Sequence, residues 1–322
     1  MSRAPVKIII PDDFPPVISG TQALRTLQAH GDVTIYTSRP ETEGELVARI
    51  RDAHTVVNIR AFCKFTGQVL QSCPDMKHLA VWGTGTDNID LQAAQALGIT
   101  VTNTPNTATD AVAEQGLALM LAVARKIPPI DAQVKRGEWV RGMLAQLYGK
   151  TLGIIGTGVI GLRMAELGRG IGMHVIAWTF HPDPSKAQAV GFRYLPSMAD
   201  VLREADVVSL HLRYSADTER IIGAQEFSLM KPSGIFVNTA RGQLVDQKAL
   251  YEALRDGRIA GAALDVFERE PLDPHDPLVT LSNVVLSPHT AGTTPEALMN
   301  GLNLCAANVV AFLDGRAQNR VV

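Results

Sequence analysis

Two successive series of short β-branched segments, each separated from the next by an amphipathic segment, constrain the fold of this chain most strongly. The first series occupies about the first hundred residues, and the second begins at Thr151. Strands that alternate with helical segments are typical of parallel sheets with crossover helices. The sequence therefore predicts an α/β protein with two Rossmann-like or flavodoxin-like, doubly wound parallel-sheet domains and a cleft between them.

The expected strands follow the apolar runs. In the first series they lie at 6–10, 33–36, 55–59, 78–82 and 99–103, and in the second at 151–155, 174–178, 206–210, 234–238, 261–266 and 283–287. A long apolar segment from Ala108 to Lys126, followed by Pro128 and Pro129, predicts a helix that ends before the prolines.

The last apolar segment, Pro295 to Leu313, has helical spacing and no strand after it. We expect it to pack back on the first domain. The predicted domains are therefore 1–103 plus 293–322, which binds substrate, and 104–292, which binds a dinucleotide.

Composition excludes several classes of function. The 322 residues carry a net charge of -2 without a run of Lys or Arg, which argues against nucleic-acid and membrane-surface partners. The N-terminal apolar run is too short for a signal sequence or a membrane span. Cys63, Cys73 and Cys305 lack the spacing of a disulfide framework or a metal site, so we expect no metal and a cytoplasmic location.

The segment GIIGTGVIG contains the pattern G-x-G-x-x-G at Gly156, Gly158 and Gly161, between a predicted strand and a predicted helix. In that context the first glycine permits a tight turn, the second admits a pyrophosphate, and the third allows close packing of helix and strand. The helix N-terminus then offers free N–H groups to the phosphates. The pattern predicts a dinucleotide site.

Open parallel sheets bind their ligands at the carboxyl ends of the strands. In the second series, Arg241, Glu270 and His289 each follow a different strand. A guanidinium can bind both oxygens of a carboxylate. An imidazole can exchange a proton with a hydroxyl, and a neighbouring carboxylate stabilises the imidazolium. The three residues together fit hydride transfer between a 2-hydroxy acid and a 2-oxo acid, and His211 is the competing histidine.

Several ordered motifs resemble the D-isomer-specific 2-hydroxyacid dehydrogenase family: WGTGTDNID at 82–90, NTPNTATDAVAE at 103–114, the glycine loop, VNTARGQLVD at 237–246, AALDVFEREP at 262–271 and SPHTAG at 287–292. The resemblance implies an NAD(P)-dependent dehydrogenase in which Arg241 binds the substrate carboxylate, His289 is the acid/base and Glu270 is its partner. Formate dehydrogenases, which resemble this family, carry Gln where this chain has Glu270.

The resemblance also implies the remaining contacts. Arg60 and the loop Gly83, Thr84 and Gly85 are expected to face the substrate, and Asp265 to receive the nicotinamide carboxamide. A homodimer is expected, with the arm at 126–149, which includes Trp139, taking part. The other expected cofactor contacts are Thr107, Gly156, Gly158, Val159, Ile160, Gly161, Thr179, Phe180, His181, Leu212, Arg213, Thr218, Thr239, Ala240, His289, Ala291 and Gly292.

Thr179 stands 23 residues beyond Gly156, where NAD-preferring relatives carry an Asp that binds the ribose. A hydroxyl there neither repels a 2′-phosphate nor accepts strongly from the ribose, and His181, Lys186 and Arg213 add positive charge nearby. We expect NADPH to be used at least as well as NADH; the alternative is that these are solvated loop residues and NAD still binds.

A second class of function stays open at this point. Transcriptional corepressors similar to this family keep the fold and the dinucleotide site, so a dinucleotide-sensing binding protein is the alternative. The chain lacks the long disordered flanks that recruit partners. The sequence does not rank the candidate acids, which include glyoxylate, hydroxypyruvate, pyruvate and bulkier 2-oxo acids.

Overall fold

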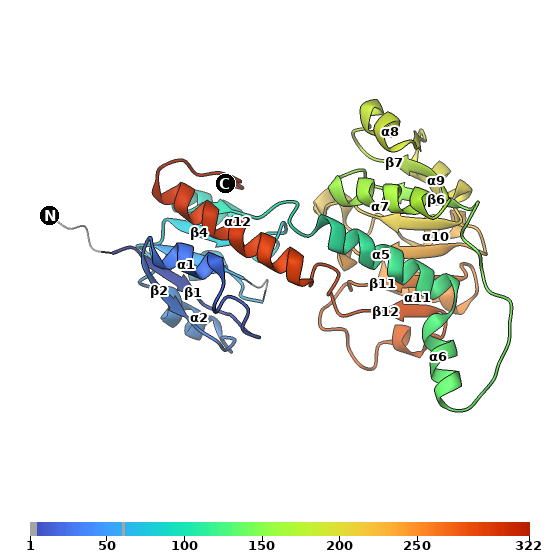
Figure 1. The fold of residues 1–322 in the computed structure, drawn as a ribbon, viewed down its shortest axis with the longest axis horizontal. Helices are drawn as coiled ribbons and strands as arrows, with labels where there is room; N and C mark the ends of the chain where they lie inside the picture. Colours follow the sequence, from blue (N-terminus) through green and yellow to red (C-terminus); the bar gives the residue numbers. More distant parts are fainter. Residues whose placement is uncertain (1–4, 60–61) are drawn as a thin grey trace. The chain divides into compact units, whose positions relative to one another are not determined.

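The computed structural model describes residues 5–59 and 62–322. The chain divides into two compact units, each with its own sheet (Figure 1). Unit 1 comprises Met1–Ala108 and Thr294–Val322, and unit 2 comprises Thr109–Thr293. The two parallel-sheet α/β domains that the sequence predicts are confirmed.

Unit 1 contains a five-stranded sheet with the order β2-β1-β3-β4-β5, and its paired strands are all parallel. This is the flavodoxin-like doubly wound order. The strands are β1 (Lys7–Ile10), β2 (Asp32–Ile35), β3 (Thr55–Asn58), β4 (His78–Val81) and β5 (Thr100–Thr102).

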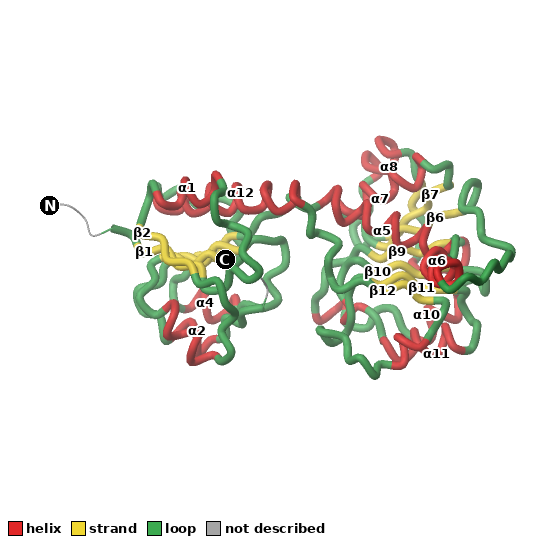
Figure 2. Tube along the Cα trace, turned by 60° about the horizontal axis from the view of Figure 1, so that its bottom comes forward, coloured by secondary structure: helices red, strands yellow, loops and turns green. Residues whose placement is uncertain are grey.

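Helices cover both faces of this sheet (Figure 2). One face packs against Ala23 and Leu27 of α1 (Gln22–Gln28) and Leu302 and Val309 of α12 (Pro295–Leu313). The other face packs against α2 (Glu43–Ile50), α3 (Gly67–Gln71) and α4 (Leu91–Ala96). The C-terminal helix therefore completes the core of the unit that begins the chain, as the sequence predicts.

Helix α12 is long and apolar enough to cross a membrane by length and composition alone. Its apolar face nevertheless belongs to the unit 1 core, where Leu302, Cys305 and Val309 are at most 1% exposed. Asn308 on the same helix donates to Asn103 O at 2.8 Å. The hydropathy of α12 is thus accounted for by packing within the unit.

Unit 2 contains a seven-stranded parallel sheet with the order β12-β11-β10-β9-β6-β7-β8. The chain order reverses between β6 and β9, as in the Rossmann fold, and such a switch point is where these sheets bind ligands. The strands are β6 (Thr151–Ile155), β7 (His174–Trp178), β8 (Arg193–Tyr194), β9 (Val207–Leu210), β10 (Ile235–Asn238), β11 (Gly261–Leu264) and β12 (Val284–Leu286).

The helices of unit 2 also form two layers (Figure 2). One face of the sheet packs against α5 (Thr109–Ala124) and α7 (Val159–Gly170), with α8 (Pro184–Val190) beside α7. The opposite face packs against α9 (Met198–Glu204), α10 (Ala224–Leu229) and α11 (Gln247–Arg255).

Most helix starts follow from a local signal in the sequence. Thr21, Thr42, Thr66, Asp246 and Thr294 each precede a helix, and each side chain accepts the backbone N–H three residues on. Such caps satisfy one of the four free N–H groups at a helix start. Helix α7 is instead preceded by Gly158, which supplies no side-chain cap.

The structure corrects the prediction for the segment after α5. The helix ends at Ala124, and Lys126 takes a left-handed conformation at φ 50°. A further helix, α6 (Ile127–Lys135), then begins with the two prolines in its first turn. Proline is favoured in a first turn because a backbone N–H at that position has no acceptor within the helix, so its absence costs no hydrogen bond. Pro128 and Pro129 therefore lie at the start of a helix as well as after the end of one.

Candidate active site

The glycine loop connects β6 to α7 at the switch point of the unit 2 sheet. Gly156 has φ +98°, and a Cβ there would lie 2.7 Å from the carbonyl carbon of His211. A Cβ on Gly161 would lie 2.0 Å from Gly156 O, whereas one on Gly158 would meet no atom within 4 Å. Two of the glycines are therefore required by packing, and the third leaves space above the N-terminus of α7.

These residues fit a dinucleotide. The α7 N-terminus is uncapped, so its N–H groups face the open space at Gly158 and favour a phosphate. Thr239, at the end of β10, is 7% exposed, and its hydroxyl has no hydrogen-bond partner in the described part of the chain. A buried hydroxyl without a partner costs free energy, which a ligand group can recover.

Arg241, Glu270 and His289 follow β10, β11 and β12, which are neighbours in the sheet. The structure therefore brings together the three side chains that the sequence places at strand ends. Nδ1 of His289 lies 2.8 Å from Oε2 of Glu270. The other carboxylate oxygen of Glu270 accepts the N–H of Phe267 at 3.0 Å.

The charge on Glu270 is favoured by its surroundings. Partial burial alone would raise its pKa, but the hydrogen bond and charge of His289, the Phe267 N–H and the charge of Arg241 together lower it below the usual 4.5. Glu270 is therefore a carboxylate at neutral pH, and this carboxylate is in hydrogen-bond contact with Nδ1 of His289.

The backbone of Arg241 is fixed by its strand end. Asn238, the last residue of β10, donates its side-chain N–H to Arg241 O at 2.9 Å, and its side-chain oxygen accepts the N–H of Ala240 at 2.9 Å. The Asn238 side chain therefore closes a short turn. This turn brings Arg241 to the edge of the sheet that carries Glu270 and His289.

A buried carboxylate holds the turn that carries His289, a residue with φ +53°. Asp265 is 0% exposed; its Oδ1 accepts from Ser287 Oγ at 2.5 Å and Thr290 N at 3.0 Å, and its Oδ2 accepts from Ala291 N at 2.9 Å. Left-handed backbone is costly for a residue other than glycine unless its surroundings fix it. The Asp265 carboxylate thus stabilises the turn that carries His289, a role that sequence reasoning missed.

His211, the competing histidine, has a different environment. Its Nε2 lies 2.8 Å from Ser209 Oγ on the same strand. Burial lowers its pKa to about 4, so the ring is neutral at pH 7. Within the described residues no ion pair joins His211 to a carboxylate, and this favours His289 as the acid/base.

The loop after β7 carries no carboxylate at the ribose position, since Thr179 follows Trp178 directly. Phe180 is 49% exposed and lies edge-on to Trp178, and His181 is exposed. Arg213, in the loop after β9, is also exposed. Strands β7 and β9 flank β6, so both loops border the glycine loop.

The other expected cofactor contacts occupy varied positions. Val159 is 48% exposed at the start of α7, and Leu212 is 8% exposed. The Thr218 hydroxyl donates to Arg213 O at 2.9 Å, so it fixes the loop that presents Arg213. Ile160, Ala240 and Gly292 are half-buried, Ala291 is buried, and Thr107 lies in unit 1.

In unit 1 the loop after β4 is bonded to Thr104, which follows β5. Gly83 N donates to Thr104 Oγ1 at 2.7 Å, and Thr104 N returns a bond to Gly83 O at 3.0 Å. The Gly83 N–H is thus paired with Thr104 within unit 1, and the substrate contacts of Gly83, Thr84 and Gly85 stay predictions. Arg60 lies outside the described residues.

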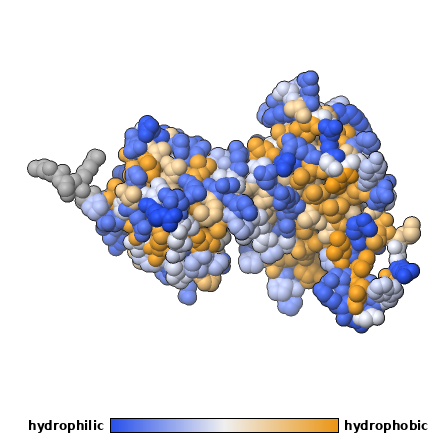
Figure 3. Space-filling view, viewed as in Figure 1, coloured by the Kyte–Doolittle hydropathy of each residue, from blue (hydrophilic) through white to orange (hydrophobic). Residues whose placement is uncertain are grey.

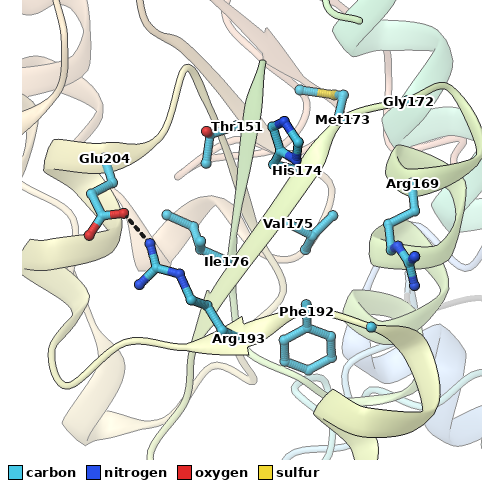
Figure 4. A pocket seen from close by; sticks show the side chains of 11 residues that line it. Thr151, Arg169, Gly172, Met173, His174, Val175, Ile176, Phe192, Arg193 and Glu204 are labelled. Carbon is cyan, nitrogen blue, oxygen red and sulfur yellow. Dashed lines mark hydrogen bonds and ion pairs between the residues drawn. The ribbon is translucent and has the colours of Figure 1, made fainter. Parts of the chain in front are cut away.

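A hollow of about 640 Å³ lies at the opposite edge of the unit 2 sheet, among the amino ends of β6, β7 and β8 (Figure 4). Arg193 and Glu204 form an ion pair across it. None of the strand-end residues lines it. Across residues 5–59 and 62–322, no three His, Cys, Asp or Glu side chains gather as a metal ion would require.

Comparison with known proteins agrees with this geometry. Residues 117–291 match the family model described as D-isomer specific 2-hydroxyacid dehydrogenase, NAD binding domain. The chain belongs to the D-isomer-specific 2-hydroxyacid dehydrogenase family. It is 41% identical over 314 residues to a glyoxylate reductase of Aeropyrum pernix, covering 94% of this chain and 92% of that protein.

Two further relatives bear on function. The D-3-phosphoglycerate dehydrogenase of Methanocaldococcus jannaschii is 39% identical over 98% of this chain, and the chain spans 59% of its length. An acyclic imino acid reductase, solved with NADPH and D-arginine, has a TM-score of 0.88 and 29% identity, and the match covers 98% of this chain and 100% of that chain. The protein is thus an oxidoreductase of the 2-hydroxyacid dehydrogenase type, and the comparisons do not favour the corepressor-like alternative.

Proposed function

We propose that this chain reduces a small 2-oxo acid to the D-2-hydroxy acid, using unit 2 to hold the cofactor. The observation that carries the proposal is the 2.8 Å pair of His289 Nδ1 and Glu270 Oε2, with Arg241 following the neighbouring strand β10. A proton donor, a carboxylate that holds it and a guanidinium are the groups that reduction of a 2-oxo acid requires.

Each residue has a distinct role in the proposed reaction. Arg241 binds the substrate carboxylate, and its charge polarises the adjacent carbonyl. His289 gives its proton to the carbonyl oxygen as the hydroxyl forms, and Glu270 keeps the imidazolium oriented through Nδ1. The reduced nicotinamide, when bound, supplies the hydride that the carbonyl carbon accepts.

The substrate proposed is a 2-oxo acid of the glyoxylate, pyruvate or hydroxypyruvate type. The glyoxylate reductase named above, matched over most of both chains, supports this class. The test is a panel of 2-oxo acids assayed for oxidation of NADH and of NADPH. Reduction of at least one acid to its D-hydroxy product is expected; an enzyme inactive on the whole panel with both cofactors would overturn the proposal.

We propose further that NADPH is used at least as well as NADH. The absence of a carboxylate at Thr179, with the exposed His181 and Arg213 on flanking loops, supports this preference. A 2′-phosphate would meet positive charge there rather than repulsion. A wild-type preference for NADH of a hundredfold or more in kcat/KM would contradict it.

We also propose that the chain acts as a homodimer in the cytoplasm. Helix α6 has no buried residue, and the arm beyond it exposes Trp139 (76%), Val140 (60%) and Met143 (96%). Hydrophobic side chains also gather on the face of unit 2 over α5 and α6 (Figure 3). Apolar surface of this extent favours a protein partner. Light scattering of the wild type and of Trp139→Ser/Met143→Ser, which should shift towards monomer, tests the dimer.

The cytoplasmic location is supported by Cys63, Cys73 and Cys305, which are all buried free thiols. Free thiols persist in reducing compartments, whereas oxidising compartments favour disulfides. Fractionation of cells that produce the protein would test this location. Recovery of the protein mainly outside the cytoplasmic fraction would contradict it.

A further inference from the structure

Tyr194, on the edge strand β8 of unit 2, is bonded to the glycine loop. Its hydroxyl oxygen lies 2.8 Å from Oγ1 of Thr157, the residue between Gly156 and Gly158. The two residues are 37 positions apart in the chain. They meet because β6, which the glycine loop follows, β7 and β8 lie side by side in the sheet. The contact is therefore a product of the strand order and not of the local sequence.

The ring of Tyr194 is fixed by its surroundings. Strand β8 pairs with β7 at Tyr194 and Ala177, and the next residue, Leu195, donates its N–H to Ala177 O at 2.8 Å. Phe192 stands edge-on to the Tyr194 ring, with the ring centres 5.0 Å apart. Both rings pack in the core between the sheet and α7. A tyrosine held in this way presents its hydroxyl at one defined place.

Thr157 occupies the part of the loop with the most backbone freedom. Glycine is the least restricted residue, and Thr157 has one on each side. The N–H of Gly156 donates to Trp178 O at 2.8 Å, whereas a Cβ on Gly158 would meet no atom within 4 Å. Thr157 itself is 5% exposed. Its bond to Tyr194 therefore restrains the loop directly before the N-terminus of α7.

The N–H groups at the start of α7 bind a pyrophosphate well only if the loop holds them in place. A loop that is ordered before the ligand arrives loses less conformational entropy on binding. We propose that Tyr194 is a positioning residue for the cofactor: through Thr157 it holds the glycine loop in the conformation that receives the pyrophosphate. The inference rests on the proposed function, because it requires that unit 2 binds a dinucleotide.

A purely structural role for the bond gives a different expectation. If the pair only satisfied two hydroxyl groups, its loss would lower the free energy of unfolding and leave the cofactor affinity of the folded protein unchanged. If the pair positions the loop, the affinity falls for every ligand that carries the pyrophosphate. The experiment therefore measures binding as well as turnover.

Tyr194→Phe removes the hydroxyl and keeps the ring. Titration calorimetry with NADPH, NADH and ADP-ribose should give dissociation constants about fivefold to tenfold higher than those of the wild type. All three ligands carry the pyrophosphate, so the ratio of the NADPH and NADH constants should not change. Adenosine 2′-monophosphate, which lacks the pyrophosphate, should bind both proteins equally. In turnover the KM for the cofactor should rise, while kcat at saturating cofactor stays within about twofold.

Variants of Thr157 test the bond from its other end. Thr157→Val loses the hydroxyl and should weaken the same ligands as Tyr194→Phe does. The double variant should bind no more weakly than either single variant, because the same bond is lost in all three. Thr157→Ser keeps the hydroxyl and should keep the affinity within about threefold. Tyr251→Phe is the matched control, since Tyr251 is half-buried on α11, on the opposite face of the sheet, and its loss of a hydroxyl should leave cofactor affinity unchanged.

The outcomes distinguish this inference from the proposed function. Unchanged dissociation constants in Tyr194→Phe, losses that add in the double variant, or an equal weakening of adenosine 2′-monophosphate would overturn the inference and leave the cofactor site intact. Failure of the wild type to bind either NADH or NADPH would instead remove the proposed function, and the inference with it.

Discussion

Nδ1 of His289 and Oε2 of Glu270 lie 2.8 Å apart although the residues are 19 positions apart in the chain. The contact forms because β11 and β12 are neighbours, so the segments that follow them meet at one edge of the sheet. The proposed proton donor and the carboxylate that orients it therefore come from two different loops.

His289→Ala should lower kcat/KM for the 2-oxo acid by about a thousandfold, within the range expected for loss of a general acid. Arg241→Ala should cost at least as much, because it removes a charge-matched contact to the transition state. Steady-state kinetics measure both, and titration of bound NADPH checks that cofactor binding survives. His211→Asn is the control, and its loss should stay within tenfold; near-native activity in His289→Ala would transfer the acid/base role to His211.

Glu270→Gln should move the pH profile more than it lowers the maximal rate. Reduction needs a proton on His289, and the negative charge of Glu270, whose pKa is lowered, stabilises that proton at neutral pH. As the pH is raised, Glu270→Gln should therefore lose reductase activity at a lower pH than the wild type does. Profiles of kcat/KM for the two enzymes decide the point, and coincident midpoints would argue against coupling.

Asp265→Asn should disturb the His289 turn although Asp265 does not contact His289 through its side chain. The amide would set N–H donors against Ser287, Thr290 or Ala291, whose groups now donate to the carboxylate. Leaving such buried groups unpaired costs about 1–3 kcal/mol of stability. Both kcat and the free energy of unfolding in urea should fall, and kcat should fall more than the affinity for the cofactor. An unaffected kcat would contradict the positioning role.

Thr179→Asp should swing cofactor selectivity towards NADH. A carboxylate at this position can accept from the ribose hydroxyls and repel a 2′-phosphate, effects worth about 1–3 kcal/mol together. The ratio of kcat/KM for NADPH to that for NADH should then fall by roughly tenfold to a hundredfold. Thr179→Ser, which keeps the hydroxyl, should leave the ratio in place.

The buried His78 makes unit 1 sensitive to acid. Burial lowers its pKa to about 3; Nε2 lies 2.9 Å from Thr102 Oγ1, and the ring stacks on Phe312. The folded state therefore resists a proton that the unfolded chain accepts below pH 6.5, so the stabilisation is complete above that pH and is lost as the pH falls towards 3. Between pH 6.5 and 5 the loss is about 2 kcal/mol.

Urea unfolding at pH 7 and pH 5 measures this effect. His78→Gln should show a smaller difference between the two free energies of unfolding than the wild type does, even if the variant is less stable at both. An identical difference in the two proteins would assign the acid sensitivity to other groups.

Some features of this structure can be predicted from the sequence, and others cannot. The strand-end residues Arg241, Glu270 and His289 are found from sequence because the edge at which a parallel sheet presents its loops depends only on strand direction. Strand β8 was missed because two residues, Arg193 and Tyr194, leave no periodic signal. The bonds of Asp265 and Thr104 were also missed, since partners in distant loops depend on how strands are ordered, which local patterns do not encode.

The position of α12 affects the order in which the two units can fold during synthesis. Unit 2 is one continuous segment, whereas unit 1 is built from residues on both sides of it. Ile8, Ile10 and Leu27 are covered by a helix that begins at Pro295. During synthesis, all of unit 2 leaves the ribosome before α12 does, so unit 2 can close its core first. The face of β1 that packs against α12 stays uncovered by this helix until α12 has been made.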